Sequence, residues 1–190
     1  FDSGVNDNPM GLLYNERNSN PVENPAMIEI IPATTHETIE SMISLAREYV
    51  TWMLAEVRVR YPQLDTEEFA SERSYDDIRK KFPGEHVAPF GGLFIAMHDG
   101  EVCGCIALGK LTDDIGEVRT LYVRPTHRGT GIGKLLVDRV LGEARRMGYS
   151  TVRLDTLAFM TDALKLYRGV GFRDIPSYRE STASLDRKST

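Results

Sequence analysis

The spacing of apolar residues along the chain predicts an alternation of strands and helices. Short apolar runs rich in β-branched and aromatic residues predict strands at residues 27–32, 93–97, 102–108, 117–123 and 151–157. Apolar residues that recur three and four positions apart predict helices at residues 36–60, 132–147 and 159–168, and a shorter charged helix at residues 66–82. With a last strand after Phe172, the predicted order is β-α-α-β-β-β-α-β-α-β.

The segments between and outside these elements define one domain. Asp99-Gly100 lies between two apolar runs and predicts a tight hairpin. Residues 1–26 contain six asparagines and three prolines with little periodic apolar content, which predicts a flexible N-terminal tail. Within this tail, Gly11–Tyr14 could dock locally. The domain is predicted to span residues 27–178 and to be followed by a polar C-terminal tail at residues 179–190.

One connection in this order determines the type of sheet. A helix joins the strands at 117–123 and 151–157, and a helical crossover makes two strands parallel. The rest of the sheet is expected to be antiparallel. We therefore expect an α/β (α+β) fold with a mixed central sheet.

Composition excludes several classes of function. The 190 residues carry a formal net charge of −5 with a pI near 5.4, which argues against nucleic acid as a partner. No apolar run approaches the roughly 18 residues of a membrane span, and no signal-peptide pattern begins the chain. Cys103 and Cys105 are the only cysteines, and no further His/Cys cluster accompanies them. This pattern favours two reduced thiols in a cytoplasmic protein without a metal or a membrane partner.

Three alternating glycines lie where the strand at 117–123 gives way to the helix that starts at Ile132. Glycine lets the backbone turn tightly and approach a ligand, and the first turn of a helix presents unpaired N–H groups to anions. Arg128 and Lys134 add positive charge. The pattern predicts a phosphate site, although a turn without a ligand could hold the same residues. The glycines are Gly129, Gly131 and Gly133.

The spacing of this segment excludes two common phosphate-binding motifs. A P-loop has four residues between its first glycine and Gly-Lys-Ser/Thr, but Arg128 occupies the first glycine position and Leu135 replaces the hydroxyl. Lys134 stands where a dinucleotide fingerprint has its third glycine. The ligand must therefore be recognised by a different arrangement.

The remaining pattern is Arg-x-x-Gly-x-Gly behind a strand that ends in Val-Arg-Pro. A second motif runs from Leu154-Asp155-Thr156-Leu157 through Ala163 and Leu166-Tyr167 to Gly171-Phe172. The joint spacing of both motifs around one βαβ unit resembles the GCN5-related N-acetyltransferase (GNAT) superfamily. The resemblance covers roughly residues 27–178.

The resemblance implies a GNAT-like fold in which the strands at 117–123 and 151–157 splay apart in a V. The pantetheine arm of the cosubstrate acetyl-CoA would lie in the gap, with its amides on the backbone of Leu121, Tyr122 and Val123. Its pyrophosphate would lie on Arg128, Gly129, Thr130, Gly131, Ile132, Gly133 and Lys134. The implied reaction is direct acetyl transfer to a primary amine of a small molecule or peptide, without a metal.

The resemblance also implies two catalytic side chains. A primary amine must lose a proton before it attacks, because a lysine-type amine has a pKa of about 10.4. Glu117, which begins the strand that floors the cleft, is the candidate base. Tyr167 matches the tyrosine that commonly protonates the leaving CoA thiolate in the family. The alternatives are a surface carboxylate at Glu117 and a half-buried structural aromatic at Tyr167.

Two departures from the family pattern affect these expectations. Met160 stands where the family often has an asparagine that contacts CoA. Residues 181–190 are polar, so the usual final strand could be missing, truncated or supplied by a partner chain in a homodimer. A non-catalytic CoA-binding sensor or regulatory module is the alternative function. Such a module would keep the glycine segment without needing Glu117 or Tyr167.

Overall fold

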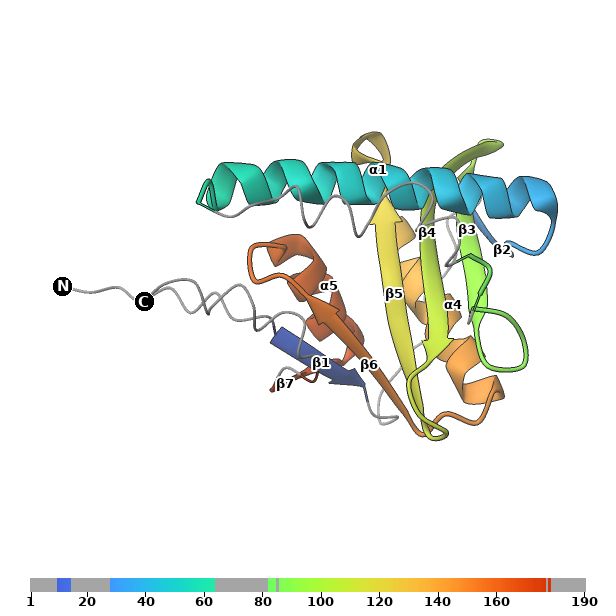
Figure 1. Cartoon of the computed structure of the whole chain (residues 1–190). Coiled ribbons are helices and arrows are strands. Elements are labelled where there is room, and N and C mark those ends of the chain that lie inside the picture. Colours follow the sequence, from blue (N-terminus) through green and yellow to red (C-terminus); the bar gives the residue numbers. More distant parts are fainter. Residues whose placement is uncertain (1–9, 15–27, 64–81, 85, 177, 179–190) are drawn as a thin grey trace.

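A single mixed sheet organises the part of the chain that the structure describes (Figure 1). The computed structural model describes residues 10–14, 28–63, 82–84, 86–176 and 178. The strands are β1 (Met10–Tyr14), β2 (Ile28–Pro32), β3 (Gly92–His98), β4 (Glu101–Lys110), β5 (Ile115–Val123), β6 (Thr151–Thr156) and β7 (Arg173–Ile175). The helices are α1 (His36–Arg60), α4 (Ile132–Arg146), α5 (Thr161–Val170) and the short 3-10 helix η1 (Pro125–His127).

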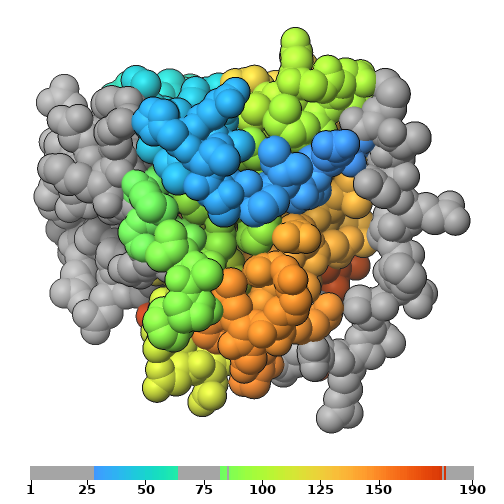
Figure 2. Space-filling view, turned by 90° about the vertical axis from the view of Figure 1, so that its right-hand side faces the viewer, coloured from blue at the N-terminus to red at the C-terminus, as the bar shows by residue number. Residues whose placement is uncertain are grey.

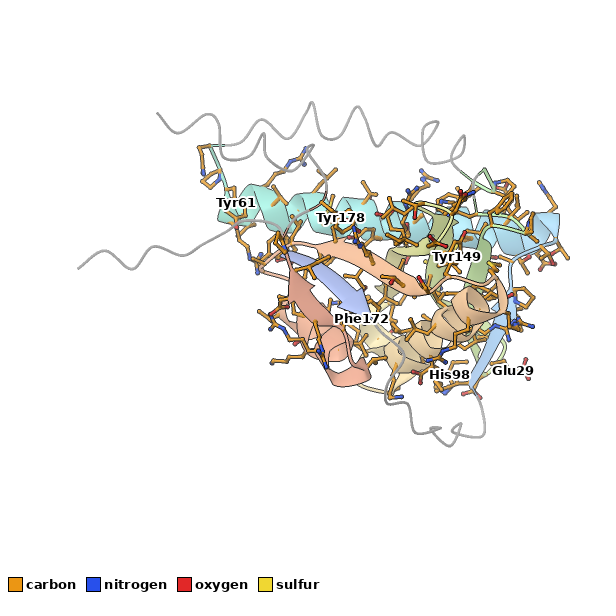
Figure 3. The ribbon with its side chains drawn as sticks, turned by 90° about the horizontal axis from the view of Figure 1, so that it is seen from below. Glu29, Tyr61, His98, Tyr149, Phe172 and Tyr178 are labelled. Atoms are coloured by element: carbon orange, nitrogen blue, oxygen red, sulfur yellow. The ribbon has the colours of Figure 1, made fainter. Side chains whose placement is uncertain are left out.

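The helices cover the sheet on both faces. Strands lie in the order β2-β3-β4-β5-β6-β1-β7. Helix α1 lies on one face, while α4 and α5 lie on the other (Figure 3). The larger core fills the α4 and α5 side and includes Phe94, Ile106, Leu108, Leu136, Val140, Leu154 and Phe172. A second core between the sheet and α1 includes Met42, Leu45, Leu93, Ile95, Ala107 and Tyr122.

Helix α1 forms where its sequence pattern predicts and runs the length of one face. Thr35 caps its start, because the Thr35 hydroxyl accepts from the Thr38 N–H and the Thr38 hydroxyl accepts from the Thr35 N–H. Its apolar stripe is buried on the sheet, as the periodicity requires. The side of the molecule in Figure 2 shows β2 and the first half of α1, in blue, next to α4, in orange.

Strands β5 and β6 are paired at one end only. Their parallel register covers Ile115–Glu117 against Thr151–Arg153, and no further pairs join them. Beyond this point the two strands diverge (Figure 1), which confirms the predicted V-shaped splay. A bulge in β5 at Thr120, whose φ is 53°, reverses the faces of the residues that follow it. Val118 therefore shares the α4 side with Leu121 and Val123.

Most of the predicted elements are confirmed within a few residues. The hairpin between β3 and β4 turns at Asp99 and Gly100, with φ of 52° and 83°, as an Asp-Gly pair predicts. The parallel pairing of the strands at 117–123 and 151–157 is also confirmed. The predicted helix at 66–82 lies outside the described residues except for Phe82, and the predicted C-terminal tail at 179–190 lies outside them entirely.

Residues 10–14 correct the prediction of an unstructured tail for this segment. They form β1, which pairs antiparallel with β6 on one side and with β7 on the other. Leu12 of β1 pairs with Leu154, which is far away in the sequence. Polar segments flank the short apolar run of residues 10–14 on both sides. A strand completed by such distant pairing leaves little local signal, so only local docking of residues 11–14 could be anticipated.

Candidate functional site

The glycine segment turns sharply between β5 and α4. Gly129 and Gly131 have φ of 78° and 87°, a conformation that residues with side chains rarely adopt. Helix α4 starts at Ile132 without any side chain that caps its first N–H groups. These donors therefore remain available to an anion, and the positive end of the helix dipole favours one there. The backbone of this segment has the conformation and free donors that an anion site requires, and the phosphate itself stays a prediction.

The two positive side chains of the segment are occupied by other partners. The Lys134 ammonium pairs with the Asp138 carboxylate at 2.7 Å. Arg128 donates from Nε to the Val123 carbonyl oxygen at 3.0 Å, and its guanidinium carbon lies 5.0 Å from the centre of the Trp52 ring. Arg128 thus lies across the end of β5, over the Trp52 ring.

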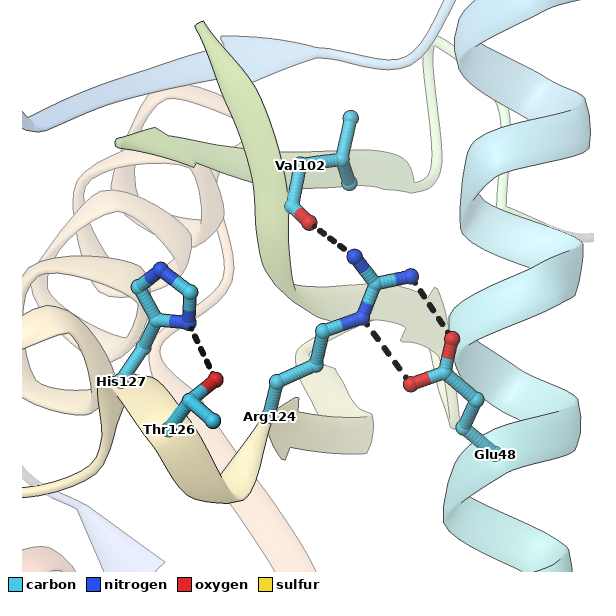
Figure 4. A network of polar contacts seen from close by, with 5 residues as sticks. All are labelled: Glu48, Val102, Arg124, Thr126 and His127. Atoms are coloured by element: carbon cyan, nitrogen blue, oxygen red, sulfur yellow. Dashed lines mark hydrogen bonds and ion pairs between the residues drawn. The ribbon is translucent and has the colours of Figure 1, made fainter. Parts of the chain in front are cut away.

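An ion pair missed by sequence reasoning joins this turn to α1 (Figure 4). Arg124 donates to both carboxylate oxygens of Glu48, at 2.7 and 3.0 Å, and to the Val102 carbonyl oxygen at 2.6 Å. Glu48 in turn raises the pKa of Arg124, chiefly through these hydrogen bonds. The Val-Arg-Pro pattern contains Arg124, but nothing near it in sequence points to a partner 76 residues away. The pair ties α1, β4 and the start of the turn together.

Tyr49, Trp52 and Tyr122 form an aromatic group between α1 and β5. The Tyr49 ring centre lies 6.2 Å from that of Tyr122 and 6.3 Å from that of Trp52. Because of the bulge, Tyr122 faces α1 while Leu121 and Val123 contact the core under α4. The predicted pantetheine segment therefore presents side chains to both faces.

Tyr167, on α5, is a buried member of the larger core. It is 6% exposed and packs edge-on against Phe172, with ring centres 5.6 Å apart. Burial raises the pKa of Tyr167 well above its usual range, and Tyr49 and Asp155 raise it further. The hydroxyl therefore stays protonated at neutral pH and can donate a proton to a nearby anion. The Tyr167 side chain is thus more buried than the half-buried aromatic of the structural alternative.

Glu117 lies at the closed end of the gap, in the last residue pair that joins β5 and β6. Its side chain is 0% exposed, so the alternative of a surface carboxylate is wrong. Its Oε2 is paired with Arg119, and its Oε1 accepts a hydrogen bond from the Tyr178 hydroxyl at 2.9 Å. Figure 3 shows Tyr178 on the α1 side of the sheet. Sequence reasoning gave no role to Tyr178, because nothing local links it to β5.

His86 is a second residue that sequence reasoning missed. It is 5% exposed, and its Nδ1 lies 3.2 Å from the Leu108 carbonyl oxygen. Its ring fills the space over Gly109, where a Cβ would be 3.1 Å away. Gly109 is the cross-strand partner of Glu117, and cross-strand partners point to the same face. Because Gly109 has no side chain, the His86 ring can occupy the space on the face that Gly109 shares with Glu117.

Met160 has a structural position. It is 9% exposed and packs with Met53, Leu54 and neighbouring apolar residues between α1 and α5. Its thioether accepts a hydrogen bond from the Thr156 hydroxyl at 3.5 Å. The polar contact that the family often makes at this position is replaced here by apolar packing.

The described part of the chain contains neither a candidate metal site nor a helix suited to span a membrane. No group of three or more His, Cys, Asp or Glu side chains there is arranged to hold a metal ion. Among the same residues, no helix combines the length and apolar character that crossing a bilayer requires.

Comparison with known proteins identifies the family. The model of the acetyltransferase (GNAT) family matches residues 48–172. An uncharacterized N-acetyltransferase of Schizosaccharomyces pombe is 30% identical over 117 residues, which are 59% of this chain and 72% of that protein. An IAA acetyltransferase of Azospirillum brasilense is 40% identical over 83 residues, which are 43% of this chain and 54% of that protein. The chain therefore spans about half the length of this second relative.

The fold has solved counterparts as well. The crystal structure of a predicted acetyltransferase with acetyl-CoA from Clostridium acetobutylicum superposes with a TM-score of 0.59 at 17% identity. The match covers 81% of this chain and 95% of that one. The family match over residues 48–172 contains both sequence motifs and the whole gap between β5 and β6. On this evidence the chain belongs to the acetyltransferase (GNAT) family.

Proposed function

We propose that the protein transfers the acetyl group of acetyl-CoA directly to a primary amine of a small molecule or peptide. The observation that carries this proposal is the uncapped start of α4 beside the gap between β5 and β6. The start of α4 can hold a diphosphate, and the gap between β5 and β6 can hold an extended chain attached to that diphosphate. The family membership and the acetyl-CoA in the Clostridium acetobutylicum structure support this choice of cosubstrate.

The backbone does most of the cosubstrate binding. The N–H groups of residues 129–134 would hold the pyrophosphate, and the peptide groups of residues 121–123 would pair with the pantetheine amides. The Val123 carbonyl oxygen currently accepts from Arg128 Nε at 3.0 Å. Cosubstrate binding at this carbonyl therefore displaces Arg128, whose guanidinium is then free to approach the phosphates.

Two side chains would carry the proton transfers. Glu117 removes a proton from the amine, acting through a water molecule because both of its oxygens already have partners. The amine nitrogen then attacks the thioester carbonyl carbon and the carbon–sulfur bond breaks. Tyr167 donates its proton to the departing CoA thiolate, and the extra proton on the new amide nitrogen returns through solvent to the Tyr167 oxygen.

The test combines binding and turnover. Calorimetry with CoA is expected to show a single site, and acetyl-CoA with a panel of amines is expected to release thiol. Tyr167→Phe should lower kcat by about 100-fold with little change in the affinity for CoA, because general acids contribute on this scale. Binding of CoA without thiol release for any amine would favour the non-catalytic sensor instead, and the absence of any measurable affinity for CoA would overturn both. Competition with longer acyl-CoA esters shows whether a larger donor is preferred.

A further inference from the structure

A set of polar side chains lies at the closed end of the gap, on the α1 face of the sheet. Glu117 and Arg153 are register partners in the parallel pair, so their side chains share a face. Val152 and Leu154, which flank Arg153 on β6, are buried in the core on the opposite face. Arg153 therefore points to the same side as α1, together with Glu117.

These side chains contact one another and form what we call the fork cluster: Glu117, Arg119, Arg153 and Tyr178. Glu117 is paired with Arg119 and accepts from the Tyr178 hydroxyl at 2.9 Å. The guanidinium carbon of Arg153 lies 5.7 Å from the centre of the Tyr178 ring. Tyr178 thus contacts both Glu117 and Arg153.

The fork cluster holds more positive than negative charge. Two guanidinium groups accompany one carboxylate, and that carboxylate is paired with Arg119. Among the described residues, Arg153 makes no hydrogen bond or ion pair, and its Nε is buried without a partner. A buried donor without an acceptor is unfavourable, so the site is stabilised by any ligand that brings an anionic oxygen to this position.

We propose that Arg153 binds a carboxylate of the acceptor, so that the acceptor is a small amine that also carries a carboxylate, as a free amino acid does. This inference rests on the proposed function. The closed end of the gap is on the same strands as residues 121–123, where the pantetheine amides are expected to lie. An acceptor anchored at the closed end by its carboxylate would direct its amine towards the open end. Arginine is suited to this role because its planar fork matches a carboxylate.

Paired ligands test the proposal. The protein, saturated with CoA, is titrated by calorimetry with free amino acids and with the corresponding amino acid amides, which keep the amine and side chain but lose the negative charge. At least one free amino acid should bind with an affinity at least about tenfold higher than that of its amide, which is the scale of a charge-assisted hydrogen bond. Arg153→Met should remove this preference while leaving the affinity for CoA and for the amides unchanged.

Matched variants separate binding from folding. Arg146→Met removes an exposed arginine from the end of α4 and should keep the preference. Arg153→Lys keeps the charge without the planar fork and should keep a reduced preference, and it also serves if Arg153→Met does not fold. Thiol release with the same ligand pairs should show the preference as a lower KM for the acids.

Several outcomes would overturn the proposal. Equal binding of acids and amides, no binding of any free amino acid, or tighter binding of peptides with amidated carboxyl ends would each exclude a carboxylate site. An equal loss of affinity for the free amino acids and for their amides in Arg153→Met would exclude such a site as well. If CoA itself does not bind, the proposed function fails, and the comparison of acids with amides on the free protein still decides the role of Arg153.

Discussion

At the open end of the gap between β5 and β6, the groups available to a ligand belong to the backbone, whereas at the closed end they belong to side chains. The start of α4 offers peptide N–H groups, and the charged side chains beside it have other partners. The fork cluster instead offers guanidinium, carboxylate and hydroxyl groups from three separate segments. Backbone recognition suits the diphosphate of a common cosubstrate, while side chains can distinguish one acceptor from another.

The largest expected effect comes from the closed end. Glu117→Gln should lower kcat by about 100-fold or more, because an amide cannot take the proton that general base catalysis requires. The affinity for CoA should not change, since the fork cluster lies away from the glycine segment. Steady-state kinetics and calorimetry measure the two quantities separately. Glu101→Gln, at an exposed carboxylate on β4, is the control. A kcat within threefold of the wild-type value would show that Glu117 is not the base.

A smaller effect is expected from the backbone at the open end. Gly131→Val places a β-branched residue at a φ of 87° and should weaken CoA binding by roughly tenfold to 100-fold, the loss of one charge-assisted hydrogen bond. Gly148→Val is the matched control, because Gly148 has a φ of 85° at the other end of α4. Both variants should lose about 2–8 °C in Tm from backbone strain. An equal loss of CoA affinity in both would mean that general destabilisation, rather than the phosphate contact, explains the effect.

The difference between the two ends also explains what could be predicted from the sequence. The glycine segment is contiguous, so its turn, its helix start and its ligand class follow from residues 128–134 alone. The strands and helices around it follow from apolar periodicity for the same reason. Glu117 and Tyr167 were reached only through the resemblance to a family; both are buried in the structure, and their catalytic roles stay predictions.

The remaining features depend on pairing between distant parts of the chain. Nothing near Arg124 points to Glu48, and nothing near Gly109 indicates that His86 fills the space above it. Tyr178 joins Glu117 across 61 residues. Strand β1 completes the sheet from the other end of the chain. Each of these contacts requires the topology to be known first, so the closed end of the gap could not be read from local pattern.

The ion pair between α1 and the turn should have a moderate effect on stability. Glu48→Gln removes the charge that holds Arg124, and a partly exposed pair of this kind contributes about 1 kcal/mol or less, or up to about 2–4 °C in Tm. Glu48 and Arg124 are 35% and 36% exposed, so salt should reduce the difference between variant and wild type. Glu56→Gln breaks a similarly exposed pair with Arg60 within α1 and is the control. Thermal unfolding at two salt concentrations measures both. A larger loss in Glu56→Gln would contradict a special role for the Arg124 pair.

The smallest expected effect concerns the ionisation of Tyr167. Burial raises its pKa in the native state above the ordinary value of about 10, so the native phenol keeps its proton at a pH where the unfolded chain has lost it. The unfolded state then binds fewer protons, and the free energy of unfolding should fall as the pH rises above about 10. Tyr167→Phe should reduce this fall. Phenolate absorbance of the native protein should be the same for the variant and the wild type up to about pH 11, while the two should differ by one tyrosine in denaturant. A difference of one tyrosine in the native proteins would show that the hydroxyl is open to solvent and ionises freely, which a buried proton donor cannot do.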